Sequence, residues 1–247
     1  MGLHFRNNRR REEQLNQERW RQERDVPTWG GIPICIITTA IFLFEEYYLL
    51  GVGFLVLGIA GLWDDRKGIS VESKLIAQIV AVSCLMVQCG LSITWMNCFI
   101  FFCAIALINA MNMIDNMDGL CAGVALITCL FFGEWWFAVL LAAFLFFNFP
   151  NAKVFLGDCG SMTIGLFLAW CCFRETGIEW MRCGLILIVP IADVVFVTVT
   201  RIARGQRPWI GDTTHLSHRL ARKVGDTGAV VILGWCCIVG GLLSTLI

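Results

Sequence analysis

The sequence predicts an all-α, polytopic membrane protein with about nine transmembrane helices and a functional cytoplasmic face. Three observations predict this fold. Of the 247 residues, 57% are hydrophobic and 15% are charged, and the mean hydropathy of +0.72 is far from that of an ordinary soluble domain. The apolar residues gather in runs with short polar connections, and the basic residues lie almost entirely on one side of those runs.

The apolar runs are expected to be helices, because backbone polar groups cannot stay unpaired in lipid. A helix needs roughly 20 apolar residues to cross the hydrocarbon core, and fewer when neighbouring helices bury its ends. We expect an Arg-rich cytoplasmic segment over residues 1–30 and a single transmembrane domain over residues 31–247. The expected helices cover residues 31–45, 48–63, 74–91, 93–113, 120–133, 135–149, 162–173, 181–200 and 228–247.

The basic residues set the expected orientation, because loops rich in Lys and Arg stay in the cytoplasm. With the N-terminus inside, nine crossings place all of the 19 basic residues except Arg174 and Arg182 on the cytoplasmic side. The outward connections are then short, whereas every inward connection carries acids, amides or histidines. No cleavable signal peptide is expected, so the helices themselves would direct insertion.

The remaining composition narrows the class of protein further. Most of the 13 cysteines lie inside apolar runs, where they are expected to pack as small side chains rather than form a disulfide framework. The formal net charge is zero, so no nucleic-acid partner is expected.

Asp64 and Asp65 end the second predicted helix, at the depth where the apolar chain meets the cytosol. Carboxylates are mildly unfavourable at a helix C-terminus, so a compensating group is expected. A divalent cation or the side chain of Lys74 would serve. The alternative is a solvated helix end.

Asn112, Asp115 and Asp118 follow one another at every third position near the end of the fourth predicted helix. Residues three apart share a helix face, so Asn112 can stand over Asp115 and share a ligand with it. Ionisable groups at membrane depth are costly and indicate function. A polar network between helices is the alternative.

Asp158 lies between Gly157 and Gly160 in a predicted turn, and Ser161 is expected to be the N-cap of the following helix. This arrangement suits a hard cation on Asp158, with phosphate oxygens completing the coordination of Mg²⁺. An ordinary tight turn is the alternative.

His215 and His218 lie in the longest inward connection, with Arg207 and Arg219 nearby. Together these side chains suit a polyanion such as pyrophosphate. Zinc is less favoured, because neither a cysteine nor a third histidine accompanies the pair. A basic, solvated loop remains the alternative.

In these clusters the sequence resembles the polyprenyl-phosphate N-acetylhexosamine-1-phosphate transferase family, also called glycosyltransferase family 4. The resemblance spans roughly Pro27 to Arg219. The matching segments are Pro27 to Gly31, the Asp64–Asp65 pair, Asn109 to Leu120, Ala152 to Gly165, Pro190 to Asp193, and the His215 loop.

The resemblance implies a helical enzyme of the bacterial inner membrane that depends on Mg²⁺, with Mn²⁺ as a substitute. It implies a UDP-sugar donor, a polyprenyl phosphate acceptor in the membrane lipid, UMP as product and a homodimeric assembly. Asp158 resembles the metal ligand. The catalytic residues implied are Asp64, Asp65, Asp115 and Asp118, and the substrate-binding residues are Lys74, Asn112, His215, His218 and Arg219.

The sequence departs from the family pattern in three places. Ser217 stands where another histidine is usual. Asn116 stands where glycine is usual, which we expect to be tolerated because Asn enters left-handed backbone conformations readily. A helix preceding the Pro27 loop is expected to be absent.

The expected reaction is attack of a lipid phosphate oxygen on the β-phosphorus of the UDP-sugar. A two-step route through an aspartyl phosphate stays open as an alternative mechanism. The sequence favours N-acetylglucosamine 1-phosphate as the transferred group over phospho-MurNAc-pentapeptide. A membrane transporter and a non-catalytic scaffold are further alternatives, although a transporter is expected to place its polar groups at mid-membrane.

Overall fold

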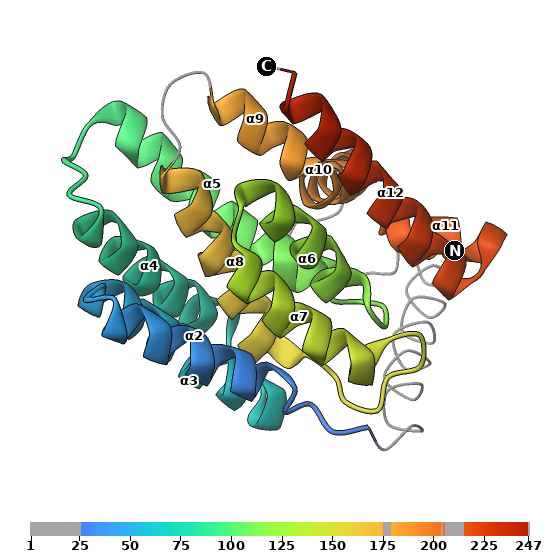
Figure 1. The fold of residues 1–247 in the computed structure, drawn as a ribbon, viewed down its shortest axis with the longest axis horizontal. Helices are drawn as coiled ribbons and strands as arrows, with labels where there is room; N and C mark the ends of the chain where they lie inside the picture. The colour runs from blue at the N-terminus through green and yellow to red at the C-terminus, as the bar shows by residue number, and fades with distance from the viewer. Residues whose placement is uncertain (1–25, 175–178, 204, 206–214, 247) are drawn as a thin grey trace.

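The computed structural model describes residues 26–174, 179–203, 205 and 215–246, and the regular structure within these ranges is helical (Figure 1). Residues 1–25, most of the Arg-rich segment, lie outside them. The helices are α2 (Gly31–Phe44), α3 (Tyr48–Lys67), α4 (Val71–Gln88), α5 (Trp95–Ile114), α6 (Leu120–Phe132), α7 (Trp135–Asn148), α8 (Gly157–Arg174), α9 (Glu179–Ile186), α10 (Ile188–Ala203), α11 (Leu216–Val224) and α12 (Asp226–Ser244).

The helices are those of a multi-pass membrane protein. Within the described ranges, α3, α4, α5 and α12 are each long and apolar enough to cross a bilayer, and α9 with α10 adds a fifth span if this bent pair is counted as one. Helices α2, α6 and α7 are apolar but only 13 or 14 residues long. The all-α membrane fold is therefore confirmed, whereas nine crossings remain a prediction.

Contacts between helix ends show that the helices from α3 to α8 run in alternating directions. At one end of the bundle, the backbone amide of Leu49 at the start of α3 donates to Gln88 at the end of α4. At the same end, Arg174 pairs with Glu134, and Arg182 donates to the carbonyl of Phe131. The other end holds the end of α3 and the starts of α4 and α8, and we call it the polar end.

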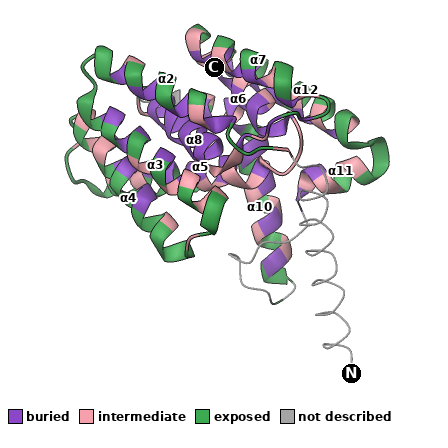
Figure 2. Cartoon of the chain, turned by 90° about the horizontal axis from the view of Figure 1, so that it is seen from below, coloured by how far each residue is buried: buried purple, intermediate pink, exposed green. Residues whose placement is uncertain are grey.

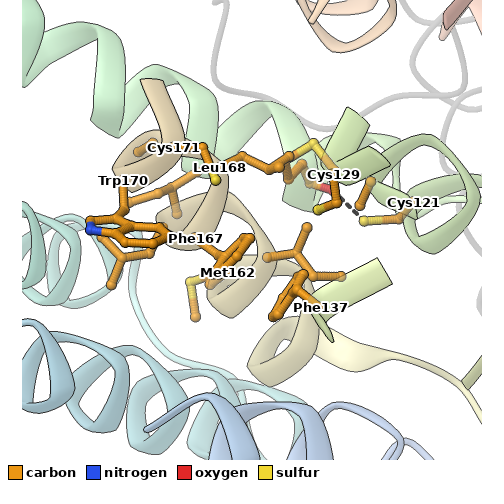
Figure 3. Close-up of a cluster of buried hydrophobic side chains, with 14 of the residues drawn as sticks. Cys121, Cys129, Phe137, Met162, Phe167, Leu168, Trp170 and Cys171 are labelled. Carbon is orange, nitrogen blue, oxygen red and sulfur yellow. Dashed lines mark hydrogen bonds between the residues drawn. The ribbon is translucent and has the colours of Figure 1, made fainter. Parts of the chain in front are cut away.

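Helix α8 forms the centre of the bundle. Every residue from Cys159 to Cys172 is buried, so this helix is covered on all sides by its neighbours (Figure 2). Figure 3 shows part of this core, where the ring of Phe167 stacks on Phe137 with centroids 3.8 Å apart and Trp170 lies nearby. The central position of α8 fixes its first turn, which carries Asp158.

Helix α3 approaches α8 closely because Gly61 has no side chain. A Cβ at Gly61 would lie 2.4 Å from the backbone nitrogen of Cys159, closer than real Cβ atoms come to other atoms. The approach brings the last turn of α3, with Asp64 and Asp65, against the first turn of α8.

The prediction of one helix over residues 181–200 is wrong. The structure has α9 and α10 there, bent by 77° at a break around Leu187. The physical reason is Pro190, which lacks an N–H and whose ring clashes with the carbonyl four residues earlier, at Ile186, where α9 ends.

The stretch around His215 and His218 was predicted as a loop, but its second half is helix α11. This short helix has basic residues in its last turn, Arg222 and Lys223, and it packs against α10 and α12. The earlier part of the predicted loop, residues 206–214 with Arg207, lies outside the described residues, as does Arg204.

The cysteines are free thiols. None of the 13 forms a disulfide, and most are buried or partly buried in the bundle. This agrees with the prediction that they serve as small packing residues.

Candidate functional site

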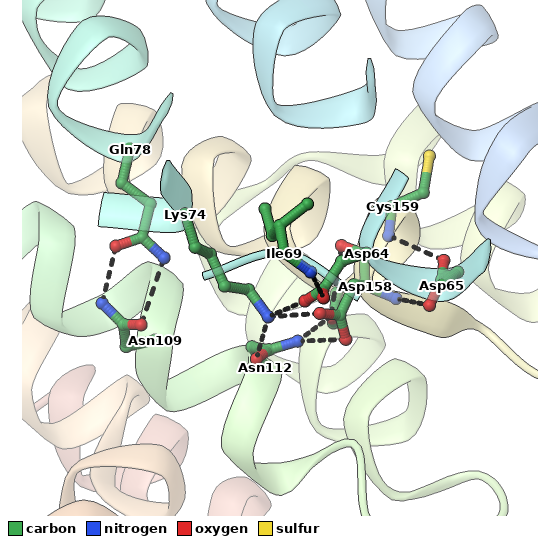
Figure 4. A network of polar contacts seen from close by, with 10 residues as sticks. Asp64, Asp65, Ile69, Lys74, Gln78, Asn109, Asn112, Asp158 and Cys159 are labelled. Carbon is green, nitrogen blue, oxygen red and sulfur yellow. Dashed lines mark hydrogen bonds and ion pairs between the residues drawn. The ribbon is translucent and has the colours of Figure 1, made fainter. Parts of the chain in front are cut away.

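Lys74 lies at the centre of a cluster of polar side chains at the polar end (Figure 4). Its Nζ donates to Asp64 Oδ2 at 2.8 Å, to Asn112 Oδ1 at 3.2 Å and to Asp158 Oδ2. The four residues come from α3, α4, α5 and α8. The side chains of Lys74, Asp64 and Asp158 are 19%, 20% and 25% exposed, so a ligand can still reach them.

The amide of Asn112 joins α5 to the first turn of α8. Its Nδ2 donates to Asp158 Oδ1 at 2.8 Å and to Ser161 Oγ at 2.9 Å. Since its Oδ1 also accepts from Lys74, both ends of this amide are used. Asn112 therefore fixes the direction in which the Asp158 carboxylate points.

Asp64 is held by two different donors at the end of α3. Besides Lys74, the backbone N–H of Ile69 donates to Asp64 Oδ1 at 2.9 Å. Lys74 thus provides the compensating positive charge that the sequence led us to expect beside a carboxylate at a helix C-terminus.

Asp65 makes a different kind of contact from its neighbour. Its Oδ1 accepts from the backbone N–H of Asp158 at 2.9 Å and its Oδ2 from that of Cys159 at 3.4 Å, so it caps the N-terminus of α8 from another helix. Gly157, with φ of +69°, leaves room for this carboxylate, since a Cβ there would lie 2.6 Å from Asp65 Oδ2.

The predicted N-cap at Ser161 is wrong. Helix α8 begins at Gly157, so Ser161 lies inside the helix, and its hydroxyl accepts from Asn112. The capping group is the carboxylate of Asp65, which is distant in sequence and could not be found from the local pattern around Ser161.

A second contact between α4 and α5 lies one turn from Lys74 and was not predicted. Gln78 Nε2 donates to Asn109 Oδ1 at 3.1 Å, and Asn109 Nδ2 donates back to Gln78 Oε1 at 2.9 Å (Figure 4). Gln78 is only 1% exposed. A glutamine inside an apolar run, four residues after a lysine, was the available signal, since both side chains lie on one face of α4.

The segment between α5 and α6 carries Asp115 and Asp118. Asp118 Oδ2 accepts from the backbone N–H of Ala152 at 3.0 Å, and Asn148 Oδ1 accepts from that of Gly119 at 2.7 Å. These contacts join the segment to the connection between α7 and α8. Asp115 is the C-cap residue of α5, one turn beyond Asn112.

His215 is paired with Asp193 of α10. His215 Nδ1 lies 2.8 Å from Asp193 Oδ2, and Asp193 Oδ1 accepts from the backbone N–H of Leu216 at 2.8 Å. Both side chains are buried. An acceptor carboxylate favours the imidazole tautomer with its proton on Nδ1, which leaves Nε2 for another partner.

His218 and Arg219 lie on the next turn of α11. The ring of His218 is 6.1 Å from that of His215, and the guanidinium of Arg219 lies over the ring of Phe196 at 4.7 Å. Burial lowers the pKa of His218 from its ordinary value, as do the neighbouring His215 and Arg222.

Two of the three departures from the family pattern, Asn116 and Ser217, contact each other. Ser217 Oγ donates to Asn116 Oδ1 at 2.9 Å. Asn116 does not use the left-handed conformation by which asparagine can replace glycine, because among the described non-glycine residues Glu46 alone has a positive φ. Asn116 therefore contributes a hydrogen-bonding amide rather than backbone freedom.

The structure groups the predicted site residues in two sets at the polar end. Asp64, Asp65, Lys74, Asn112 and Asp158 form one connected cluster. The segment with Asp115 and Asp118 follows directly along α5, and α11 with its histidines is attached to that segment by Ser217 and Asn116.

The first cluster offers oxygen ligands for a hard cation. Asp64, Asp158 and Asn112 all direct an oxygen to Lys74 Nζ, so these oxygens face a common point, at which the Lys74 ammonium lies. Within the part of the chain that the structure describes, no three His, Cys, Asp or Glu side chains gather as a metal site. Two carboxylates and an amide are oxygen ligands of the kind that Mg²⁺ prefers.

Comparison with known proteins gives consistent matches. The sequence model described as Glycosyl transferase family 4 matches residues 47–175. The undecaprenyl-phosphate alpha-N-acetylglucosaminyl 1-phosphate transferase of Thermotoga maritima is 31% identical over 85% of this chain and 73% of its own length. The decaprenyl-phosphate N-acetylglucosaminephosphotransferase of Mycobacterium leprae is 28% identical, over 86% and 71% of the two chains. A second undecaprenyl-phosphate relative, from Salmonella typhi, is 27% identical over 85% and 68%.

Proposed function

This chain belongs to glycosyl transferase family 4, and from that premise we propose that it transfers N-acetylglucosamine 1-phosphate from a UDP-sugar to a polyprenyl phosphate. UMP is the second product. The relatives named above support the transferred group and the polyprenyl phosphate acceptor through their own names.

The observation that carries the proposal is the cluster of Lys74 with two carboxylates and Asn112 at the end of an apolar bundle. A lipid phosphate must stay at the membrane surface while its prenyl chain lies in the bilayer. Partly exposed polar groups at helix ends are suited to meet such a phosphate and a water-soluble nucleotide at the same place. A transporter would be expected to hold such groups at mid-membrane instead.

The proposed reaction is an in-line displacement at phosphorus. An oxygen of the lipid phosphate forms a bond to the β-phosphorus of the donor, and the bond from that phosphorus to the bridging oxygen breaks, so that UMP leaves with the electron pair. A phosphomonoester has a second pKa near ~6, so the acceptor is already mostly dianionic at neutral pH. Alignment and charge neutralisation therefore contribute more than a general base does.

The residues have separate tasks in this reaction. The Lys74 ammonium places a positive charge beside the phosphates, and Asp64 orients that ammonium. Asn112 and Asp65 hold Asp158 in place through its side chain and its backbone. Asp158, with Asp64 and Asn112 beside it, would hold Mg²⁺, which neutralises diphosphate charge when bound.

We further propose that all nine apolar helical units cross the bilayer, with the polar end facing the cytoplasm of a bacterial inner membrane. These units are the four long spans, the bent pair, the three shorter helices and α8. Short helices can cross when neighbouring helices bury their ends. The basic residues Arg66, Lys67, Arg222 and Lys223 at the polar end support this orientation.

The test is release of UMP by the purified protein from UDP-N-acetylglucosamine and undecaprenyl phosphate in the presence of Mg²⁺. Asp158→Asn is expected to lower the rate by at least about a hundredfold, as loss of a key electrostatic group does in other enzymes. Glu72→Gln is the matched control, because this carboxylate lies at the same end of α4 but is fully exposed. Full activity of Asp158→Asn would remove Asp158 from the reaction.

Two further measurements define the reaction. Replacing the donor with UDP-MurNAc-pentapeptide should give no product, and efficient turnover of that donor would assign the chain to the other branch of the family. Incubation with labelled donor in the absence of lipid should leave no label on the protein. A labelled aspartyl phosphate would establish the two-step route.

A further inference from the structure

Helix α11 needs outside contacts to hold its position. It has nine residues, and a helix this short is marginal in water without tertiary packing. It carries His218 and Arg219, whose side chains suit a polyanion such as the diphosphate of the proposed donor. The position of this helix relative to the α5–α6 segment therefore matters for donor binding.

Two hydrogen-bonded attachments fix the start of α11, one to α10 and one to the α5–α6 segment. On one side, Asp193 of α10 accepts from the backbone of Leu216 and pairs with His215. On the other side, Ser217 Oγ donates to Asn116 Oδ1 at 2.9 Å, across 101 positions of sequence. Ser217 is only 2% exposed, so water cannot readily replace this partner.

Asn116 is itself held in place. Its Nδ2 donates to the carbonyl of Met113 at 2.9 Å, which directs its Oδ1 toward Ser217. It directly follows Asp115, and the segment that contains it is attached to the α7–α8 connection through Asp118. The amide of Asn116 is thus a fixed acceptor on the α5–α6 segment.

We propose that Ser217 and Asn116 are a pair of positioning residues that hold α11 beside the α5–α6 segment and so set the affinity for the sugar-nucleotide donor. Neither side chain needs to touch the donor. Ser217 directly precedes His218, and Asn116 directly follows Asp115, so the hydrogen bond fixes the distance between these two backbone segments. This inference rests on the proposed function, because it takes the diphosphate-bearing donor of that reaction to be the ligand of α11.

Both residues stand at positions where the sequence departs from the family pattern, and the structure gives these two departures a common explanation. A hydroxyl and an amide oxygen form a direct hydrogen bond, whereas a glycine at position 116 would offer no side-chain acceptor to residue 217. Each residue is therefore expected to depend on the other, and substitutions at the two positions should not act independently.

The first test is a double-mutant cycle on the Michaelis constants, with Ser217→Ala, Asn116→Ala and the double variant. Loss of one buried hydrogen bond corresponds to a change of about fivefold to tenfold. Each single variant should raise the donor KM by about that factor, and the double variant should raise it no further. The KM for undecaprenyl phosphate should stay unchanged.

Ser244→Ala is the matched control. Ser244 is also a buried serine, but its hydroxyl donates within α12 to the carbonyl of Gly241, at the opposite end of the bundle. This variant should leave the donor KM unchanged. If the effects of Ser217→Ala and Asn116→Ala multiply in the double variant, or if donor KM does not change, the proposed pair is wrong.

The second test needs no activity. Hydrogen–deuterium exchange of residues 215–224 should be faster in Ser217→Ala and in Asn116→Ala than in the unmodified protein, and unchanged in Ser244→Ala. Equal exchange in all four proteins would overturn the attachment itself. Absence of UMP release by the unmodified protein would instead contradict the proposed function, while the exchange measurement would still decide whether the pair holds α11.

Discussion

At the scale of single residues, His218 has the setting of an imidazole that gains a proton when an anion binds. Burial lowers the pKa of His218, with His215 and Arg222 adding to the effect, while Asp226 and Asp193 oppose it. The unbound protein therefore holds His218 mainly neutral at pH 7. A bound diphosphate would favour the charged form and raise the pKa of this group.

The expected result is a pH-dependent affinity for the donor. At pH values between the lowered pKa of His218 in the free protein and its higher pKa in the complex, donor binding takes up a proton. The Kd for UDP-N-acetylglucosamine should therefore rise as pH rises through that window. In His218→Gln the Kd for the donor should be larger, and it should no longer depend on pH in this way. Calorimetric titration in two buffers of different ionisation enthalpy measures the proton uptake directly, and equal uptake by both proteins would exclude His218 as its source.

The same group affects stability in a definite direction. Because the folded pKa lies below the unfolded value of about 6.5, the unfolded chain binds this proton more readily. The contribution of His218 to the free energy of unfolding is fully present at pH values above its pKa in the unfolded chain. This contribution is lost as pH falls through its lower pKa in the folded protein. Acidification should therefore destabilise the protein less in His218→Gln.

The sequence located the acidic residues at one end of the bundle but not their separate tasks. Asp64 and Asp65 are adjacent and chemically identical, yet one contacts Lys74 and the other caps α8. The difference depends on which way each carboxylate points once α3 packs on α8. Local sequence does not contain that information, which is why Ser161 was mistaken for the cap.

At the scale of helices, the contact between α3 and α8 depends on Gly61. Replacement by Ala would place a Cβ against the backbone of Cys159, which cannot move as a flexible side chain can. We expect Gly61→Ala to destabilise the protein by about 1–3 kcal/mol, the usual cost of adding atoms to a well-packed core. The substitution should also lower activity, because it displaces Asp158.

Gly123→Ala is the matched substitution for that measurement. Gly123 lies within α6, and a Cβ there would meet no atom within 4 Å. Alanine is the better helix former by about 1 kcal/mol, so this variant should be slightly more stable. Thermal unfolding of both variants in detergent distinguishes a specific close contact from a general effect of adding a methyl group.

Helix existence was predictable from apolar runs, whereas helix breaks and surface helices were not. The bend at Leu187 follows from Pro190, but a proline also occurs in continuous transmembrane helices when neighbours satisfy the freed backbone groups. Helix α11 is polar on much of its surface and is held by Asp193 and Ser217, so its stability comes from partners elsewhere in the chain.

At the scale of the whole molecule, the alternating helices make a prediction about orientation. A fluorescent protein fused after Gly68, in the connection between α3 and α4, should fluoresce, because that connection lies at the polar end. Alkaline phosphatase fused after Leu91, between α4 and α5, should be active outside the cytoplasm. The reverse pattern would place the polar end outside and contradict a reaction with a cytoplasmic nucleotide.

The grouping of distant segments was the part of the fold that the sequence predicted best. Residues 64, 112 and 158 were each expected at the inner end of a helix. Because membrane helices cross the bilayer in alternating directions, these inner ends lie on the same side. The orientation of the Lys74 side chain and the Gln78–Asn109 contact depend on how α4 rotates against α5. Such rotation is set by packing of the whole bundle.

The contact of Asp65 with the start of α8 has a practical consequence for the construction of hybrid proteins. Asp65 supports the backbone of Asp158 from another helix, and its neighbour Asp64 shares Lys74 with the side chain of Asp158. Residues 61–65 and 157–161 are therefore one unit assembled from two distant pieces. A chimera with a relative should exchange both segments together. A crossover between them would combine one segment from each protein, and the contacts between the two segments would then be mismatched.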